Sequence, residues 1–364
     1  MRFSVRWLAL VAVLLLVLVL AVTTYRRANP TLRPADSSRP LVLPRDEAAH
    51  GDAAVEWWYY TGHLLADDGS RYGFELVFFQ AFLPAQIKLW GPVGMSWLVN
   101  PLYFAHFAVT DEGGQAFTYR TRMNFPRFWE AGADAARHRL WNGDWFVEGS
   151  AGRYTLQAMQ DGMAIDLNLA SAKPPVLHGD QGIIPMGHAG GSYYYSYTRL
   201  EGQGQLTLSG TTRPVQAVAW MDHQWGNWQQ MGAFQGWDWF AIQLEDKSEL
   251  MLFYFRNNDG STQAALGSFI APDGSTQHLA AGDFQVAAQG HWTSPYTGGT
   301  YPLGWRVTVP GKGLDLTVRP TMFDQELKVM PTTYWEGSTL VVGQSGGQPI
   351  KGRGYVEMTG YAGH

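Results

Sequence analysis

Short runs of aromatic and β-branched residues recur along the chain from Trp57 onward, and polar turn residues separate them. Spacings of this kind predict successive antiparallel hairpins. The acidic turns are Asp67-Asp68-Gly69, Asp111-Glu112-Gly113, Asp161-Gly162 and Asp273-Gly274. Only Glu130–Leu140 has the alanine-rich composition of a helix. The pattern therefore predicts an all-β architecture with almost no long helix after the N-terminal segment.

An internal repeat indicates two similar halves. The stretch Glu56–Leu64 aligns without gaps on Gly236–Leu244, and both stretches then reach an acidic turn and a second apolar strand. Chance similarity of two aromatic hairpins is the alternative explanation. Small all-β units must close or sandwich their sheets to hide the edges. We therefore predict two antiparallel barrels, each of a size that holds one ligand, with room for a pocket between them.

The N-terminus has the character of a targeting segment. Arg2 and Arg6 precede the apolar run Trp7–Val22, whose length lies between a signal-peptide core and a full membrane span. Residues 28–45 are rich in Pro, Arg and Ser, as in an extended linker. We expect a signal or anchor at 1–27, a linker at 28–44, a first domain at 45–215 and a second domain at 216–364.

Composition excludes several classes of protein. The chain has no cysteine, which excludes disulfides, thiolate metal sites and a cysteine nucleophile. The net charge is −5, and residues 1–40 carry an excess of arginine, so the body of the chain is acidic. An acidic body without a basic stripe does not fit a nucleic-acid partner. Low charge with many glycines and aromatics argues against disorder.

Ordered sequence blocks carry a family resemblance. They are His50 with Glu56–Gly62, then Tyr193–Leu200, Ala219–Gly226, Gly236–Phe240, Tyr334–Gly337 and Gly354–Tyr361. In these blocks the chain resembles the carotenoid hydratase (hydroxyneurosporene synthase) superfamily, most closely its secreted branch of predicted hydrolases associated with ABC export systems. The resemblance covers nearly the whole chain after the linker. It implies two lipocalin-like antiparallel β-barrel domains, in agreement with the internal repeat.

The resemblance also implies a chemistry. Hydratases of this superfamily add water to an isoprenoid double bond without a cofactor, and the matching His and Trp of the third block are His223 and Trp225. The hydratases also use a Tyr-x-Asp pair. Its nearest counterpart is Tyr254-Phe255-Arg256, where a cation replaces the carboxylate. That departure weighs against hydratase activity.

The residues themselves support acid chemistry. Hydration of an alkene needs an acid to protonate carbon, an aromatic face for the cation and a positioned water. On a strand, Asp238 shares a face with Phe240, and Glu56 shares one with Trp58, so burial would keep either carboxyl protonated. The alternative is a structural carboxylate that binds an indole or a hydroxyl.

A pairing of Asp222 with His223 needs a loop or bulge, because neighbours on a strand point to opposite faces.

The candidate site residues fall into a catalytic group and a ligand-binding group. The catalytic candidates are His223, Trp225, Asp222, Asp238 and Glu56, and the ligand-binding candidates are Trp58, Tyr60, Trp237, Trp239 and Tyr254. For the tryptophans a plain core role is the alternative. We expect Glu56, Asp222, His223, Trp225, Trp237 and Asp238 to converge on one pocket at or beside the domain interface.

Other motifs give no site. Gly343–Gly347 fits the nucleophile-elbow pattern, but Gln348 and Pro349 follow instead of a helix, so we predict a hairpin loop and no serine hydrolase. No two histidines have zinc spacing and no phosphate-binding glycine loop occurs, so we expect neither a metal nor a cofactor.

Two functions remain open. The first is a lipocalin-like protein of the cell envelope, periplasmic or otherwise extracytoplasmic, that binds an apolar lipid or isoprenoid ligand and works with an ABC exporter. The alternative is a cofactor-independent hydratase or isomerase of an isoprenoid double bond. Arg256 in place of a carboxylate favours binding, whereas Asp222-His223 and Asp238 favour an enzyme.

We predict that the body of the protein stays tethered to the membrane through residues 7–25. The best small-residue cleavage motif, Ala21-Val22-Thr23, is poor and Arg26 follows closely, which favours an uncleaved anchor. Membrane fractionation with N-terminal sequencing tests this. A soluble product that begins near residue 24 would show a cleaved signal instead.

Overall fold

The computed structural model describes residues 13–16, 19, 31–82, 100–126, 130–186, 190–227, 235–257, 259–329 and 333–362. Most of the expected anchor at residues 7–25 therefore lies outside the described residues. Within them, no helix has the length and apolar character that a membrane crossing requires. Among the described residues, helix is confined to residues 13–16 and 19 and to two short 3₁₀ helices, η1 (Arg45–Glu47) and η5 (Pro310–Lys312), and the remaining elements are strands.

The first sheet has thirteen antiparallel strands in the order β4-β3-β2-β1-β13-β12-β9-β8-β7-β6-β5, with β10 and β11 also paired to β12. Its strands are β1 (Val55–Ala66), β2 (Arg71–Ala81), β3 (Leu102–Asp111), β4 (Ala116–Asn124), β5 (Ala131–Ala133), β6 (His138–Asn142), β7 (Trp145–Ser150), β8 (Arg153–Gln160), β9 (Met163–Ser171), β10 (Val176–Leu177), β11 (Ile183–Pro185), β12 (Gly191–Leu208) and β13 (Thr211–Gly226). The sheet curls until β4 at one end approaches β6 beside the other end, where the Asn124 amide on β4 donates to Asn142 Oδ1 on β6 at 2.7 Å.

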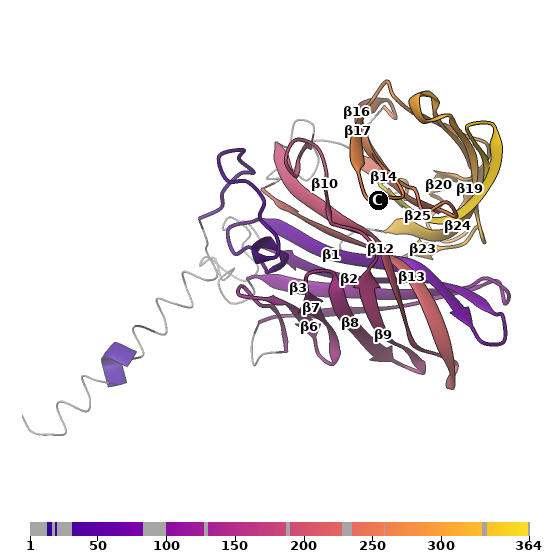
Figure 1. Cartoon of the computed structure of the whole chain (residues 1–364). Coiled ribbons are helices and arrows are strands. Elements are labelled where there is room, and N and C mark those ends of the chain that lie inside the picture. The colour runs from indigo at the N-terminus through magenta and orange to yellow at the C-terminus, as the bar shows by residue number, and fades with distance from the viewer. Residues whose placement is uncertain are drawn as a thin grey trace, which may run out of the picture.

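The second sheet has ten strands in the order β17-β16-β15-β14-β25-β24-β22-β21-β18, with β23 paired to β24. They are β14 (Gly236–Leu244), β15 (Glu249–Arg256), β16 (Thr262–Ile270), β17 (Thr276–Ala280), β18 (Gln285–Ala288), β21 (Trp305–Val309), β22 (Leu314–Pro320), β23 (Glu326–Leu327), β24 (Tyr334–Ser345) and β25 (Gln348–Thr359). A separate hairpin pairs β19 (His291–Thr293) with β20 (Thr300–Pro302). Figure 1 shows this sheet curled into an almost complete ring.

These two curled sheets confirm the prediction of an all-β, two-domain lipocalin-like fold. The internal repeat also has a structural counterpart. The aligned stretches are β1 and β14, and each lies between the strand that follows it and the last strand of its own sheet. The acidic turns connect β1 to β2, β3 to β4, β8 to β9 and β16 to β17, as predicted.

Two expectations need correction. The Glu130–Leu140 stretch is no helix, because Ala131–Ala133 and His138–Asn142 are strands that pair with each other. The boundary expected between residues 215 and 216 falls inside β13, which pairs with β1 and β12 of the first sheet. The division between the sheets therefore lies between Gly226 and Gly236. The glycine-serine motif is a β24–β25 hairpin, as predicted, with positive φ at Gly346 and Gly347.

Side chains alternate between two environments along each central strand. The inner face of the first sheet holds one apolar core, with Trp58 and Phe74 among its members, and the inner face of the second holds another around Phe240 and Trp305. The outer faces meet in a third core, in which Tyr59 of the first sheet contacts Trp239 of the second edge-on, at 5.3 Å between ring centres. In Figure 1 β1, β12 and β13 lie beside β25 and β24 along this contact.

A buried ion cluster also joins the two sheets. Lys173 Nζ lies 2.7 Å from Glu249 Oε2, and Arg199 Nε lies 2.6 Å from Glu249 Oε1. The Arg199 guanidinium also donates to the Leu244 carbonyl. Lys173 and Arg199 belong to the first half of the chain, whereas Glu249 begins β15. One carboxylate is therefore shared by two buried cations, and it offsets part of the cost of burying their charges.

We predict that Glu249→Gln lowers the free energy of unfolding by about 3–5 kcal/mol, because the amide leaves two buried cations without a counter-charge. Urea denaturation followed by tryptophan fluorescence measures the loss. Asp315→Asn is the control, since Asp315 pairs with Arg306 in an exposed position and its loss should leave the midpoint unchanged. Equal midpoints for Glu249→Gln and the native chain would contradict the prediction.

Candidate functional site

An aromatic cavity lies where the outer faces of the two sheets meet. Its volume is about 50 Å³, enough for more than one water molecule. Trp57 and Tyr59 of β1 form one wall, and Trp237 and Trp239 of β14 form the facing wall with Phe253 of β15. Trp57 and Trp237 stack with their ring centres 6.3 Å apart. Both rings are only half-buried, so they form the rim of the cavity.

Two carboxyl groups line this cavity from equivalent positions in the two sheets. Asp222 on β13 lies opposite Tyr59 on β1, and Glu357 on β25 lies opposite Trp239 on β14. The same equivalence relates Tyr194 on β12 to Tyr334 on β24. The duplicated hairpins thus bring one acid from each half of the chain to a shared apolar surface.

The two acids have different hydrogen-bond partners. The Asp222 carboxyl accepts hydrogen bonds from Tyr194 Oη at 2.7 Å, from Trp220 Nε1 at 2.6 Å and from the Ser196 hydroxyl. Glu357 accepts one from Trp237 Nε1 at 3.1 Å. Burial raises the pKa of each acid to about 7, because the apolar surroundings disfavour the anion. Both acids therefore titrate near neutral pH.

Two further carboxyls lie behind the cavity wall. Glu336 accepts a hydrogen bond from the Tyr59 hydroxyl, and Glu75 accepts one from the Tyr334 hydroxyl at 2.7 Å. Burial raises the pKa of Glu75 to about 8, and burial together with the neighbouring acids raises the pKa of Glu336. Among the described residues, the second oxygen of each carboxyl has no hydrogen-bond partner, so a single tyrosine hydroxyl would have to stabilise each anion. The interface therefore contains a group of protonated carboxyls.

A chain of hydrogen bonds leads from Asp222 toward the surface. The Ser196 hydroxyl, which donates to Asp222, lies 2.7 Å from Nε2 of His178. The other nitrogen of His178 lies 2.9 Å from the Ser268 hydroxyl, which is 3.5 Å from the ring of the exposed His278. Burial lowers the pKa of His178 to about 3, so its ring is neutral and can both donate and accept.

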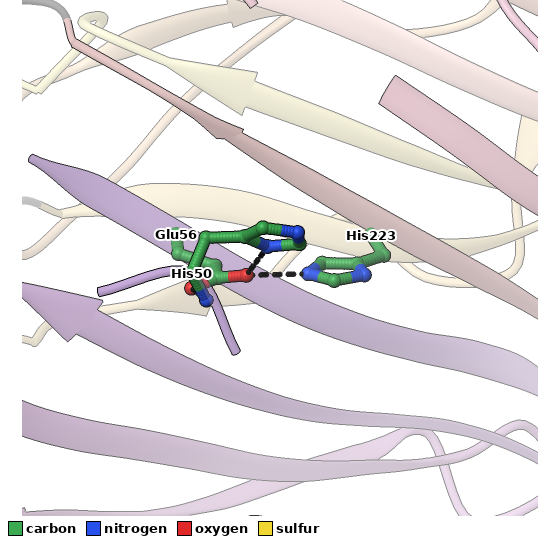
Figure 2. Close-up of side chains that lie close together, drawn as sticks. All are labelled: His50, Glu56 and His223. Atoms are coloured by element: carbon green, nitrogen blue, oxygen red, sulfur yellow. Dashed lines mark hydrogen bonds and ion pairs between the residues drawn. The ribbon is translucent and has the colours of Figure 1, made fainter. Parts of the chain in front are cut away.

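His223 belongs to a different cluster, on the inner face of the first sheet. Figure 2 shows its ring and the ring of His50 directed at the same carboxyl, that of Glu56. Glu56 Oε1 lies 2.7 Å from His223 Nε2 and 2.7 Å from His50 Nδ1. Trp225 stacks on His50, with ring centres 3.9 Å apart. Burial lowers the pKa of His223 to about 4, whereas Glu56 raises that of His50 to about 9 against the opposing effect of burial.

Asp238 lies in a third place, the interior of the second sheet. Its carboxyl pairs with Arg256 Nε at 3.1 Å and accepts a hydrogen bond from the Tyr361 hydroxyl at 3.0 Å. Burial raises the pKa of Asp238, although Arg256 opposes the shift. Tyr254 packs against the core of the same interior. The cation at position 256 therefore serves an ion pair within the second sheet and does not line the interface cavity.

The residues that we expected in one pocket therefore lie in three separate places. Asp222, Trp237 and Trp239 line the interface cavity, whereas Glu56, His223 and Trp225 meet inside the first sheet together with Trp58 and Tyr60. Asp238 faces the other way from Trp237 and Trp239, as alternation along a strand requires. Asp222 and His223 likewise point to opposite faces of β13 and do not form a pair.

Sequence reasoning missed several residues of the cavity. Glu357, Tyr194 and Tyr334 all lie within the sequence blocks named above, but no rule for single residues distinguished them. A signal was present in the repeat. Extending the equivalence of β1 and β14 to their partners β13 and β25 would have matched Asp222 with Glu357.

Comparisons with known proteins support the fold and indicate a family. The model of a family described as AttH-like matches residues 34–361. A putative AttH from Nitrosomonas europaea is 29% identical, with a TM-score of 0.80 over 91% of this chain and 100% of that one. Kievitone hydratase from Nectria haematococca is 15% identical, with a TM-score of 0.70 over 91% and 96%. CghA bound to Sch210972 is 13% identical, with a TM-score of 0.54 over 92% and 98%. No curated protein sequence matches the chain.

We predict that Glu357→Gln removes a pH dependence of stability between about pH 4.5 and 7. The folded protein holds the Glu357 proton up to about pH 7, whereas the unfolded chain loses it near 4.5, so native stability falls as the pH rises through this window. One pKa unit corresponds to about 1.4 kcal/mol. Because Glu357 is partly exposed to the cavity, we expect a difference on the order of 2 kcal/mol.

The measurement is urea denaturation of both proteins at pH 4.5 and pH 7.5. Glu148→Gln is the control, because Glu148 lies on β7, away from the interface cavity. Parallel pH profiles for native protein and Glu357→Gln would show that Glu357 ionises normally in the fold.

Proposed function

The chain belongs to the AttH-like family, and we propose that it is an acid-catalysed hydratase or isomerase of a carbon–carbon double bond in an apolar, isoprenoid-like substrate. One observation carries the proposal. An aromatic cavity between the sheets is lined by two carboxyls, Asp222 and Glu357, that titrate near neutral pH. A carboxylic acid that keeps its proton close to the working pH is the kind of group that can protonate an alkene carbon.

Hydrogen bonding assigns the two carboxyls different roles. Three donors bind Asp222, and donors of this kind stabilise an anion. One indole N–H binds Glu357, which leaves its other oxygen able to carry a proton toward the cavity. We therefore assign Glu357 as the proton donor and Asp222 as the carboxylate that receives a proton from water.

The reaction balances with these two groups alone. Glu357 gives its proton to one alkene carbon, and the π electrons of the double bond form the new C–H bond. The neighbouring carbon becomes a cation, which a water molecule attacks through its oxygen while Asp222 takes a proton from that water. A proton shift from Asp222 to Glu357 then restores the starting state. If a neighbouring C–H bond loses its proton to Asp222 instead, the product is an isomer of the substrate.

The aromatic walls support this chemistry. Trp57, Trp237 and Trp239 present indole rings to the cavity, and an aromatic face within about 6 Å stabilises a cation. The cavity of about 50 Å³ has room for the reacting end of a chain and little else. We infer that the rest of an isoprenoid substrate lies outside, past the half-buried Trp57 and Trp237.

The main argument for a protein that binds its ligand without turnover no longer applies. That interpretation relied on Arg256 in place of a carboxylate, but Arg256 pairs with Asp238 inside the second sheet and does not line the cavity. The name of kievitone hydratase, a structural neighbour, favours a hydratase in addition. Association with an ABC exporter remains part of the proposal only as the source of an apolar substrate.

We predict that Glu357→Gln lowers turnover by a factor of 10² to 10⁴, the usual contribution of a general acid. The assay incubates the full chain with acyclic isoprenoids in water enriched in oxygen-18. Mass spectrometry then detects a tertiary alcohol that carries the heavy isotope. Turnover should pass through a maximum near pH 7, because Glu357 loses its proton above that pH and Asp222 gains one below it.

Asp238→Asn is the matched control. Asp238 lies on β14 between the cavity residues Trp237 and Trp239, but its carboxyl faces away from the cavity and binds Tyr361. It should retain most of the turnover. Loss of turnover in Asp238→Asn with full turnover in Glu357→Gln would reverse the assignment. A native chain that neither hydrates nor isomerises any isoprenoid would contradict the proposed function.

A further inference from the structure

We propose that His50, Glu56 and His223 form a binding site for one divalent transition-metal ion, Zn²⁺ in the first instance. One ligand atom of each residue lies within 4.8 Å of the others, a spacing that a single ion can bridge. The atoms are Nδ1 of His50, Oε1 of Glu56 and Nε2 of His223, and Figure 2 shows the two rings turned toward the carboxyl. The expectation that no metal site exists considered only histidines close in sequence.

The remaining polar atoms of these side chains already have outer partners. Oε2 of Glu56 accepts a hydrogen bond from the backbone N–H of His50 at 2.8 Å. Nδ1 of His223 lies 3.2 Å from the Tyr195 hydroxyl, and Nε2 of His50 lies 3.8 Å from Oδ1 of Asp46. Partners of this kind orient metal ligands in metalloproteins, and here they leave the three inner atoms directed at one another.

The ligand set selects the class of ion. Two imidazoles and one carboxylate suit zinc and similar borderline ions, whereas calcium and magnesium prefer oxygen ligands throughout. Three protein ligands leave a fourth position for water. Beside the cluster, Trp58 stacks on His223 with ring centres 4.8 Å apart, and its buried indole N–H has no partner among the described residues.

Burial and position explain how an ion would enter and what it would do. Glu56 and His223 are fully buried, whereas the side chain of His50 is 18% exposed, so the route runs past His50. His50 lies in the segment that precedes β1, and the other two ligands lie on the adjacent strands β1 and β13. An ion would fix that segment to the first sheet. This site is independent of the interface cavity, since His223 and Asp222 face opposite sides of β13.

The test uses the full chain after dialysis against a chelator. Titration with Zn²⁺ alone, with metal content measured by mass spectrometry, should give one ion per chain and raise the melting temperature, because the ion binds the folded state. Titration with Co²⁺ should produce the visible absorption of a four-coordinate site. His50→Gln and His223→Gln should abolish this uptake, and Tyr195→Phe should weaken it by about 10- to 100-fold through loss of an outer partner.

His138→Gln is the matched control, because it removes a buried imidazole from the same interior without changing the cluster. It should bind the ion like the native chain. Native protein that is folded by circular dichroism but takes up no Zn²⁺ or Co²⁺ would overturn the proposal, even if the variants fail to fold. Uptake that persists in His50→Gln and His223→Gln would overturn it as well, since the ion would then lie elsewhere.

Discussion

The packing of one curled sheet against the other, outer face to outer face, is the constraint on which the rest of the structure depends. Each sheet fills its own interior with apolar side chains, and the faces that remain bury Tyr59, Trp220 and Trp239 against one another. This contact excludes water from four carboxyls on the central strands, which are those of Asp222, Glu357, Glu75 and Glu336. Because a carboxylate loses its solvation there, the protonated forms prevail at pH values where exposed acids are ionised.

Duplication explains why the acids come in equivalent positions. The same alternation that directs Tyr59 toward the interface from β1 directs Trp239 there from β14, and the neighbouring strands follow with Asp222 and Glu357. The two halves differ in their hydrogen bonds. Asp222 accepts from three donors and Glu357 from one, so two acids at equivalent positions have different surroundings. Pairs of acids whose surroundings differ are suited to separate acid and base roles.

Strand alternation also separates residues that are adjacent in sequence. Asp222 and His223 belong to one compact block, yet the backbone of β13 directs the first to the interface and the second to the interior of the first sheet. The block therefore contributes to two sites with different chemistry. The first is acidic and bordered by the second sheet, and the second is a His-Glu-His cluster covered by the segment before β1.

The sequence by itself determined the all-β class, the hairpins at the acidic turns, the equivalence of β1 and β14 and the faces of Glu56 and Asp238, because these depend on local turn chemistry and on the period of two along a strand. Only the tertiary structure decided which faces meet. Burial of Asp222 against Tyr194 and Trp220, the pairing of Asp238 with Arg256, and the approach of His50 to His223 depend on how the sheets curl and pack. Contacts between residues far apart in sequence follow from that packing, and no local pattern encodes them.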